Sequence, residues 1–259
     1  MPQQPILPLP PMTPLEELDV LLALMASQGG NAHEVAFDWM GRQRLAAVTG
    51  AVRFVRIAAT LEDVAAVLLG RPGRFAPSAN EYWFIRGIDG ALGLLEGRSV
   101  RGIGPDRVHL MELWRELTGR LPNAPQAAWR DREPVDAIPG VEYPAPELLE
   151  FLLERFHQEG GYLDEPAWFQ GLHPVRQAWR IFVRCARLAP FPQHNLLMAW
   201  LAACAWLRAR SYPLLVLDPS DQRLVLRHVL ADPREGPVEW EERLLAQVRH
   251  RAAPFLRTP

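Results

Sequence analysis

Residues 173–213 read HPVRQAWRIFVRCARLAPFPQHNLLMAWLAACAWLRARSYP. Pro174 suits the first turn of a helix, and the residues after it place apolar side chains on a single helical stripe. The stripe consists of Ala178, Ile181, Phe182, Cys185 and Leu188. Residues 196–207 are apolar on every face, which is typical of a helix buried at the centre of a domain. The sequence therefore predicts two consecutive core helices joined by a short turn.

This stretch resembles the core of Fic (Fido) domains, in which a helix of the type HPVxRAAxLHxxFxxIHPF precedes an active-site turn of the type xDGNGRTGRLLM. The match runs without a gap from His173 to Phe191, and RSYP at 210–213 is similar to the RAGYPP ending common in the family. Ala189 stands at the position of the family's catalytic His, and Gln193 at that of its acidic metal ligand. Five residues of the turn are missing, and with them most of the glycine and arginine anion cradle.

The resemblance implies a degenerate member that lacks the HPFx(D/E)GNGR motif. In the family, the motif His takes a proton from a hydroxyl of a target protein, which then attacks a nucleotide phosphate. Alanine has no group that can act as this base, and glutamine is a poorer magnesium ligand than a carboxylate. The shortened turn also offers fewer donors for phosphoryl charge. We therefore expect no metal site of the family's type, and a nucleotide with Mg is the one cofactor that the resemblance suggests.

His194 is the candidate catalytic residue, because it lies in the same turn and its pKa range suits a displaced base or a phosphate donor. The alternative is a structural or merely exposed histidine, since no partner that would orient it is visible in the sequence. Asn195 is expected to be the N-cap of the second helix. The candidate substrate- or nucleotide-binding residues are Phe191, Gln193, His194, Asn195 and Arg130.

Residues 121–146 contain six prolines and no helical period. Within them, REPVDAIPGVEYPAP at 132–146 resembles the flap of the family, a β-hairpin that adds an extended stretch of the target as a strand. Two short strands around Val135 and Val141 would turn at Pro139 and Gly140. The candidate flap residues are Val135, Ile138, Gly140 and Val141. An ordinary surface loop is the alternative.

The remaining pattern is mostly helical, so the predicted fold class is mainly α: a Fic-like helical domain with a short β-hairpin flap. We divide the chain into four parts: a proline-rich flexible tail (residues 1–14), an N-terminal helical part (15–100), a Fic-like core (101–235), and a C-terminal helix with its tail (236–259).

Local signals place several helix boundaries in the N-terminal part. Thr60 with Asp63, and Ser78 with Glu81, have the form of capping boxes that open helices. A second, broken helical region is expected over residues 37–48 and 54–58. Three glycines lie on one helical face and would let another helix approach closely; they are Gly87, Gly90 and Gly93. A weakened, partly irregular helix is the alternative.

The 259 residues are 49% apolar and 22% charged, which is the composition of a soluble globular protein. The net charge of −2 gives no general attraction to nucleic acid or to an anionic membrane. Twelve residues form the longest apolar run, too few to span a bilayer, and no signal peptide is recognised. We therefore expect a cytoplasmic protein, with Cys185 and Cys204 as buried, reduced packing residues.

All 28 basic residues are arginine. GC-rich coding explains the lack of lysine, and avoidance of lysine modification is the alternative.

Three functions fit these observations. The first is a catalytically inactive Fic-like protein that binds a protein or a nucleotide through the flap and the groove above Asn195. The second is a divergent, AMPylation-like transferase that modifies protein hydroxyls with His194 or an unrelated acid. The third is a regulatory or antitoxin-like partner of an active enzyme. A protein partner is expected in each case, and neither nucleic acid nor membrane is.

Overall fold

The computed structural model describes residues 12–27, 32–98, 105–124, 129–158, 166–231, 236 and 238–256. These residues are mainly helical, as predicted, and none of them forms a β strand. The predicted tail falls largely on residues 1–11, outside the described residues, and Pro14 is already the first residue of a helix.

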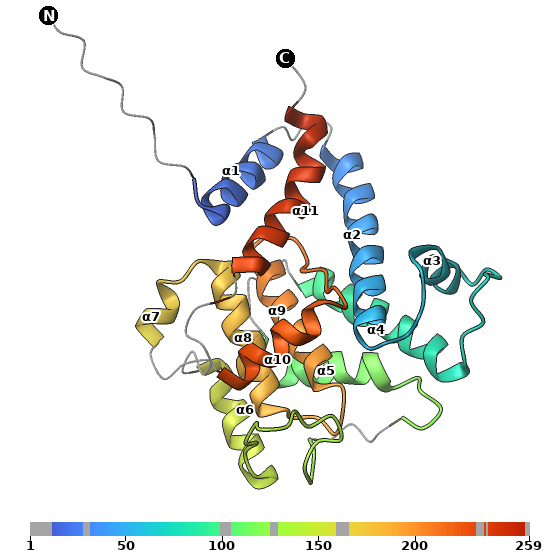
Figure 1. Cartoon of the computed structure of the whole chain (residues 1–259), viewed down its shortest axis with the longest axis vertical. Helices are drawn as coiled ribbons and strands as arrows, with labels where there is room; N and C mark the ends of the chain where they lie inside the picture. Colours follow the sequence, from blue (N-terminus) through green and yellow to red (C-terminus); the bar gives the residue numbers. More distant parts are fainter. Residues whose placement is uncertain are drawn as a thin grey trace, which may run out of the picture. The chain divides into compact units, whose positions relative to one another are not determined.

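The described helices are shown in Figure 1. In chain order they are α1 (Pro14–Ser27), α2 (Ala32–Phe54), α3 (Leu61–Leu69), α4 (Ala79–Arg98), α5 (Arg107–Thr118), the 3-10 helix η2 (Pro146–Leu148), α6 (Leu149–Gln158), α7 (Pro166–Gln170), α8 (Pro174–Leu188), α9 (Asn195–Ala209), α10 (Asp221–Ala231) and α11 (Val238–Leu256).

The chain forms two compact units, Met1–His33 with Pro237–Pro259, and Glu34–Gly236. In the smaller unit α1 packs against α11. Leu18 and Leu244 are fully buried there, and Arg249 forms an ion pair with Glu17. The candidate site lies entirely within the larger unit.

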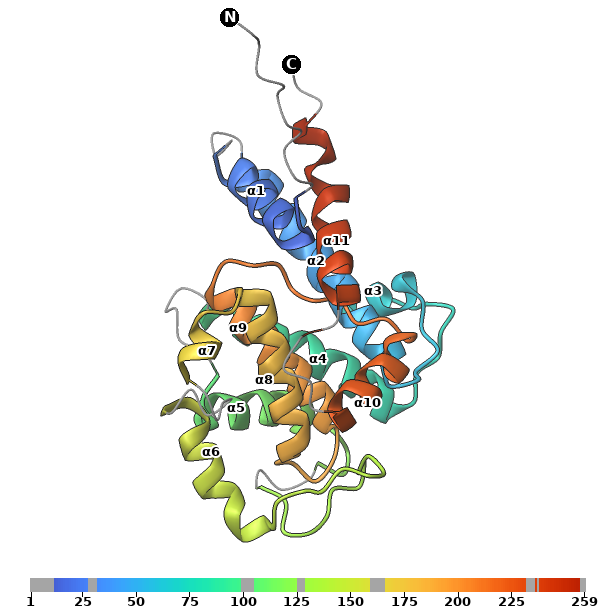
Figure 2. The ribbon, with the colours of Figure 1, turned by 60° about the vertical axis from the view of Figure 1, so that its left-hand side comes forward.

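The core of the larger unit is the helix pair α8 and α9, which lie side by side in Figure 2. Helix α9 also packs against α4 and α5, and its residues from Leu197 to Leu207 are buried on all faces. The stripe predicted for α8, from Ala178 to Leu188, is buried as well. Both predicted core helices are confirmed. They could be predicted because the spacing of their apolar residues along the chain determines which side chains are buried.

The predicted capping boxes also form. Thr60 Oγ1 accepts a hydrogen bond from the Asp63 N–H, and the Thr60 N–H donates to the Asp63 carboxylate. The same reciprocal pair joins Ser78 and Glu81 at the start of α4. Each box satisfies backbone N–H groups that a helix start leaves unpaired.

Helices α4 and α5 approach each other closely, as the spaced glycines predicted. A Cβ atom built on Gly87 would lie 2.3 Å from the Leu117 carbonyl oxygen. Any side chain at this position would push the two helices apart, so Gly87 sets their separation.

The predicted break in the second helical region is wrong, because α2 is continuous to Phe54. The chain leaves the helix only at Val55 and Arg56, and Arg56 has a φ of 68°. Gly50 lies inside this helix, where a Cβ would be 2.2 Å from the Leu217 carbonyl oxygen.

No helix in the described part of the chain has both the length and the hydropathy needed to cross a membrane.

Candidate functional site

The site begins where α8 ends. Ala189 is the C-cap residue, in the left-handed conformation with φ 40° and ψ 61°, and its N–H donates to the Cys185 carbonyl. Its side chain is 1% exposed. A non-glycine residue in this conformation costs on the order of 1 kcal/mol, so the surrounding contacts must hold it there. Ala189 therefore places a buried methyl group at the end of α8.

Arg130 is one of those contacts. Its guanidinium donates from Nε to the Ala189 carbonyl oxygen at 2.7 Å, and from Nη2 to the Pro144 carbonyl oxygen at 2.6 Å. Nη1 donates to the Arg132 carbonyl oxygen at 3.1 Å. The side chain is only 4% exposed, and burial lowers the pKa of Arg130. Arg130 thus ties the turn after α8 to the loop of residues 129–145, while its predicted contact with a nucleotide stays a prediction.

The predicted β-hairpin flap is not formed, and residues 129–145 are an irregular loop. Its backbone donors bind the turn instead of a partner strand: the Arg130 N–H donates to the Pro190 carbonyl and the Val135 N–H to the Pro192 carbonyl. The Ile138 N–H donates to the Tyr143 hydroxyl. Prolines at 134, 139 and 144 have no N–H to give to a ladder, which explains why a hairpin does not form.

The candidate flap residues lie in different surroundings along this loop. The Val135 side chain is 76% exposed, whereas Ile138 is buried. Gly140 has a φ of 85°, a value that favours glycine, and Val141 closes a turn by donating its N–H to the Ile138 carbonyl.

Asn195 is not the N-cap of α9, because His194 holds that position with a φ of 60° and no side-chain cap bond. The cap is supplied from the loop: the Asp136 carboxylate accepts from the Asn195 N–H at 2.7 Å and from Asn195 Nδ2 at 2.9 Å. A carboxylate at this end also interacts favourably with the helix dipole. Sequence reasoning missed Asp136, since nothing local marks an aspartate in a proline-rich loop as the cap of a distant helix.

The Asn195 side chain also closes the turn on itself. Its Oδ1 accepts from the Phe191 N–H at 3.0 Å, and its Nδ2 donates to the Phe191 carbonyl at 2.8 Å. Phe191 is fully buried and stacks on Trp114 with ring centroids 4.6 Å apart. Both predicted binding residues therefore anchor the turn, and any contact of theirs with a ligand stays a prediction.

His194 packs its ring against Phe84, with the centroids 4.7 Å apart. Burial lowers the pKa of His194, and the nearby Asp136 carboxylate partly opposes this. Because the lowering starts from the ordinary value near 6.5, the imidazole is largely neutral at pH 7.

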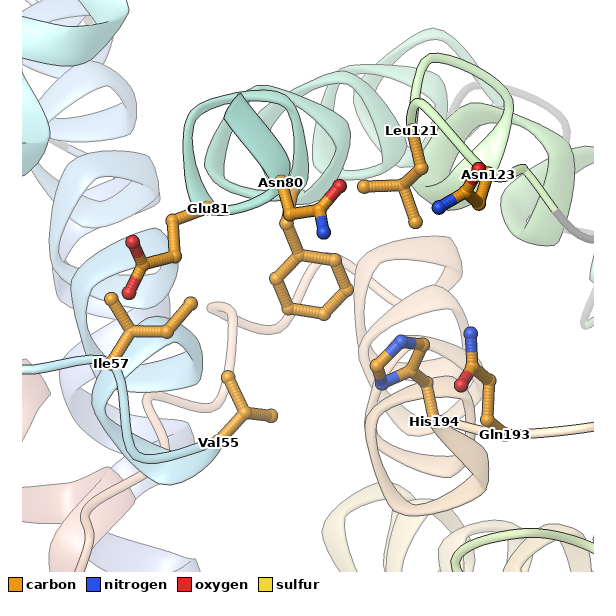
Figure 3. Close-up of a pocket in the computed structure, with 9 residues that line it drawn as sticks. Val55, Ile57, Asn80, Glu81, Leu121, Asn123, Gln193 and His194 are labelled. Carbon is orange, nitrogen blue, oxygen red and sulfur yellow. The ribbon is translucent and has the colours of Figure 1, made fainter. Parts of the chain in front are cut away.

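His194 and Gln193 line a cavity of about 330 Å³, and Figure 3 shows the side chains around it. Apolar side chains form one part of the wall: Val55, Ile57, Phe84 and Leu121. Polar side chains complete it: Asn80, Glu81, Asn123, Gln193 and His194. The turn thus meets the end of α2, the start of α4 and the loop after α5. Sequence reasoning identified only the two residues of the turn, because the others reach the cavity through tertiary packing.

Glu81 is the one carboxylate among the described residues of this wall. It accepts hydrogen bonds from the Ser78 hydroxyl and N–H. These bonds lower the pKa of Glu81, so it is ionised at pH 7. Among the described residues, no group of three or more His, Cys, Asp and Glu side chains is placed to hold a metal ion.

No protein-family model matches the sequence, and no curated protein does. Solved structures are similar in fold. A Fic domain containing signaling protein from Bacteroides thetaiotaomicron has a TM-score of 0.73 at 15% identity, over 92% of this chain and 94% of that one.

Fic-1 from C. elegans has a TM-score of 0.70 at 16% identity, over 94% of this chain and 70% of that one. A Fic family protein from Desulfovibrio desulfuricans has a TM-score of 0.61 at 16% identity, over 98% and 77%. At these identities the comparisons show the fold alone: the chain has the Fic fold.

Proposed function

We propose that this Fic-fold chain has lost nucleotide transfer and acts as a binding module for a protein or a nucleotide. The main support is Ala189, which aligns with the family's catalytic His and has a buried methyl side chain. Its carbonyl oxygen accepts a hydrogen bond from Arg130. The Ala189 side chain has no group that can accept a proton.

The hydrogen bonds that order the turn support a retained binding role over a site that has only lost its activity. Asn195 uses its backbone N–H and both ends of its amide in hydrogen bonds to Asp136 and Phe191. Such a satisfied polar network fixes a single conformation. A turn that had no use would not need these contacts, whereas a binding surface gains affinity from being ordered in advance.

A transfer assay tests the loss of activity. Purified full-length protein is incubated with each labelled nucleotide and Mg²⁺ or Mn²⁺ in host lysate, and label on protein hydroxyls is counted. The proposal expects no label above a control without the protein. Labelled protein bands that depend on the added chain would overturn it.

The second candidate is a divergent, AMPylation-like transferase, which the state of His194 favours. Burial keeps this imidazole largely neutral, and it lines the cavity next to Gln193, so it is able to accept a proton. In the same assay, label that disappears in His194→Ala and persists in the matched exposed variant Gln170→Ala would establish this function in place of the first.

The protein partner is proposed to contact the loop of residues 129–145. The loop is fastened to the turn by the Arg130 and Val135 N–H groups, and it presents the exposed Val135 side chain. Co-purification from the host tests this contact. A partner retained by the wild-type chain and lost with Val135→Asp supports the site, and equal retention by both chains contradicts it.

A further inference from the structure

The cavity beside the turn has an unusual set of polar groups, three carboxamides from three separate segments. Asn80 belongs to α4, Asn123 to the loop after α5, and Gln193 to the turn. None of these three amides makes a hydrogen bond to another residue of the described part of the chain. Figure 3 shows Asn123 and Gln193 on the same side of the cavity as His194. Each amide offers both a donor and an acceptor to a ligand.

The charged groups of the cavity wall do not favour the binding of phosphate. Glu81 brings a carboxylate, His194 is largely neutral, and none of the described residues that line the cavity is an arginine. An anion placed here would face the Glu81 carboxylate and would gain no charge-assisted hydrogen bond from an arginine of the described wall. The wall therefore selects against phosphorylated molecules and in favour of uncharged ones.

The size and the aromatic side chains narrow the ligand further. A volume of about 330 Å³ lies at the small end of the range of roughly 300–1,000 Å³ for ligand pockets, which suits one ring system better than a peptide. Phe84 and His194 supply ring surfaces that attract a planar molecule.

We propose that this cavity binds an uncharged, planar heterocycle with hydrogen-bond donors and acceptors on its edge, of the nucleobase or nucleoside kind, and rejects its phosphorylated forms. The inference rests on the proposed function, since it takes the cavity as the binding site of an inactive chain. Of the two ligands named in the proposed function, a protein or a nucleotide, it concerns the nucleotide and restricts recognition to the base.

Calorimetric titration of the full-length chain tests the ligand class. Adenosine, guanosine, cytidine and uridine are each compared with the 5′-monophosphate, so that every pair differs only in the phosphate. The expected result is that at least one nucleoside binds about tenfold or more tightly than its monophosphate. The proposal is overturned if monophosphates bind as well as nucleosides or better, or if no nucleoside binds at millimolar concentration.

Variants locate the site. Gln193→Ala and Asn123→Ala should each weaken nucleoside binding by about 2- to 12-fold, the range for one lost hydrogen bond. Gln170→Ala removes the same kind of amide from an exposed position outside the cavity and should change nothing. Asn123→Arg supplies the missing cation and should raise monophosphate affinity above that of the wild type. Unchanged binding in all the cavity variants would show that the ligand binds elsewhere and would refute the site.

The two proposals fail separately. Label transfer in the lysate assay would overturn the loss of activity and leave the titration result standing. A preference for monophosphates would overturn the ligand class without restoring transfer.

Discussion

The Asp136 carboxylate and Asn195 are joined by two hydrogen bonds, one from the Asn195 N–H and one from its side-chain amide. The two residues are 59 positions apart in the chain. A loop residue thereby caps the central helix α9 and holds the turn that lines the cavity. Stability and site geometry depend here on the same carboxylate, which gives the first prediction.

Asp136→Ala should lower the free energy of unfolding by about 1–3 kcal/mol, because the Asn195 amide and N–H lose their acceptor. Denaturant unfolding followed by circular dichroism measures the change. Asp131→Ala removes an exposed aspartate from the same loop and should stay within about 0.5 kcal/mol of the wild type. Equal losses in the two variants would contradict the cap.

On the function proposed above, Ala189→His should not give transfer, because Gln193 is a poorer magnesium ligand than a carboxylate and no group of three or more His, Cys, Asp and Glu among the described residues is placed to hold a metal ion. It should also destabilise the fold by about 1–3 kcal/mol, since a large side chain must enter a fully packed position. Ala189→Gly is the matched control. Glycine suits the positive φ at this position, and the substitution should cost less than about 1 kcal/mol, because relief of strain offsets the lost methyl group. Thermal unfolding and the labelling assay check both outcomes, and label transfer by the histidine variant would refute this account.

Arg130→Lys should be strongly destabilising although it keeps the charge. A lysine ammonium cannot reproduce the planar fork that reaches the Ala189, Arg132 and Pro144 carbonyls. We expect a loss of about 2–4 kcal/mol, because the buried Ala189 carbonyl and the partly buried Pro144 carbonyl lose their donors. Arg132→Lys, at an exposed position of the same loop, is the control and should be nearly neutral. The two melting curves decide, and the prediction fails if they coincide.

His194 should make stability depend on pH. Its pKa in the folded chain is lowered by burial, so the unfolded chain takes up the proton first as the pH falls. The stabilising effect of the neutral ring is therefore complete above the unfolded pKa of about 6.5 and is lost as the pH drops below it. The free energy of unfolding of wild type minus that of His194→Gln should decrease from pH 8 to pH 5, two values chosen to lie about 1.5 units on either side. A flat difference would show that the ring is not buried in solution.

The sequence predicted those parts of the fold that depend on neighbours along the chain. The stripe of α8, the apolar surface of α9 and the capping boxes at Thr60 and Ser78 are all patterns within about four residues. The glycine at 87 predicted a close helix approach for the same reason, and the structure shows the Leu117 backbone at that point.

The parts that could not be predicted depend on which distant segments meet. Asp136 caps α9 only because Arg130 and Val135 fasten their loop to the turn. The resemblance of residues 132–146 to the family's flap suggested strands around Val135 and Val141, yet the Arg130 and Val135 N–H groups donate to carbonyls of the turn instead. Asn80 and Asn123 carry no local signal at all, and they line the cavity through the packing of α4 and α5 against α9.

The 59-residue separation of Asp136 from Asn195, and of Arg130 from Ala189, also orders the assembly of the chain. Helices α8 and α9 meet across a short turn, so they can dock early, whereas the loop must close a long stretch of chain before its bonds form. The core can thus be complete while the cavity wall is still open. We therefore expect binding competence to be acquired late in folding and to be lost early when local unfolding begins.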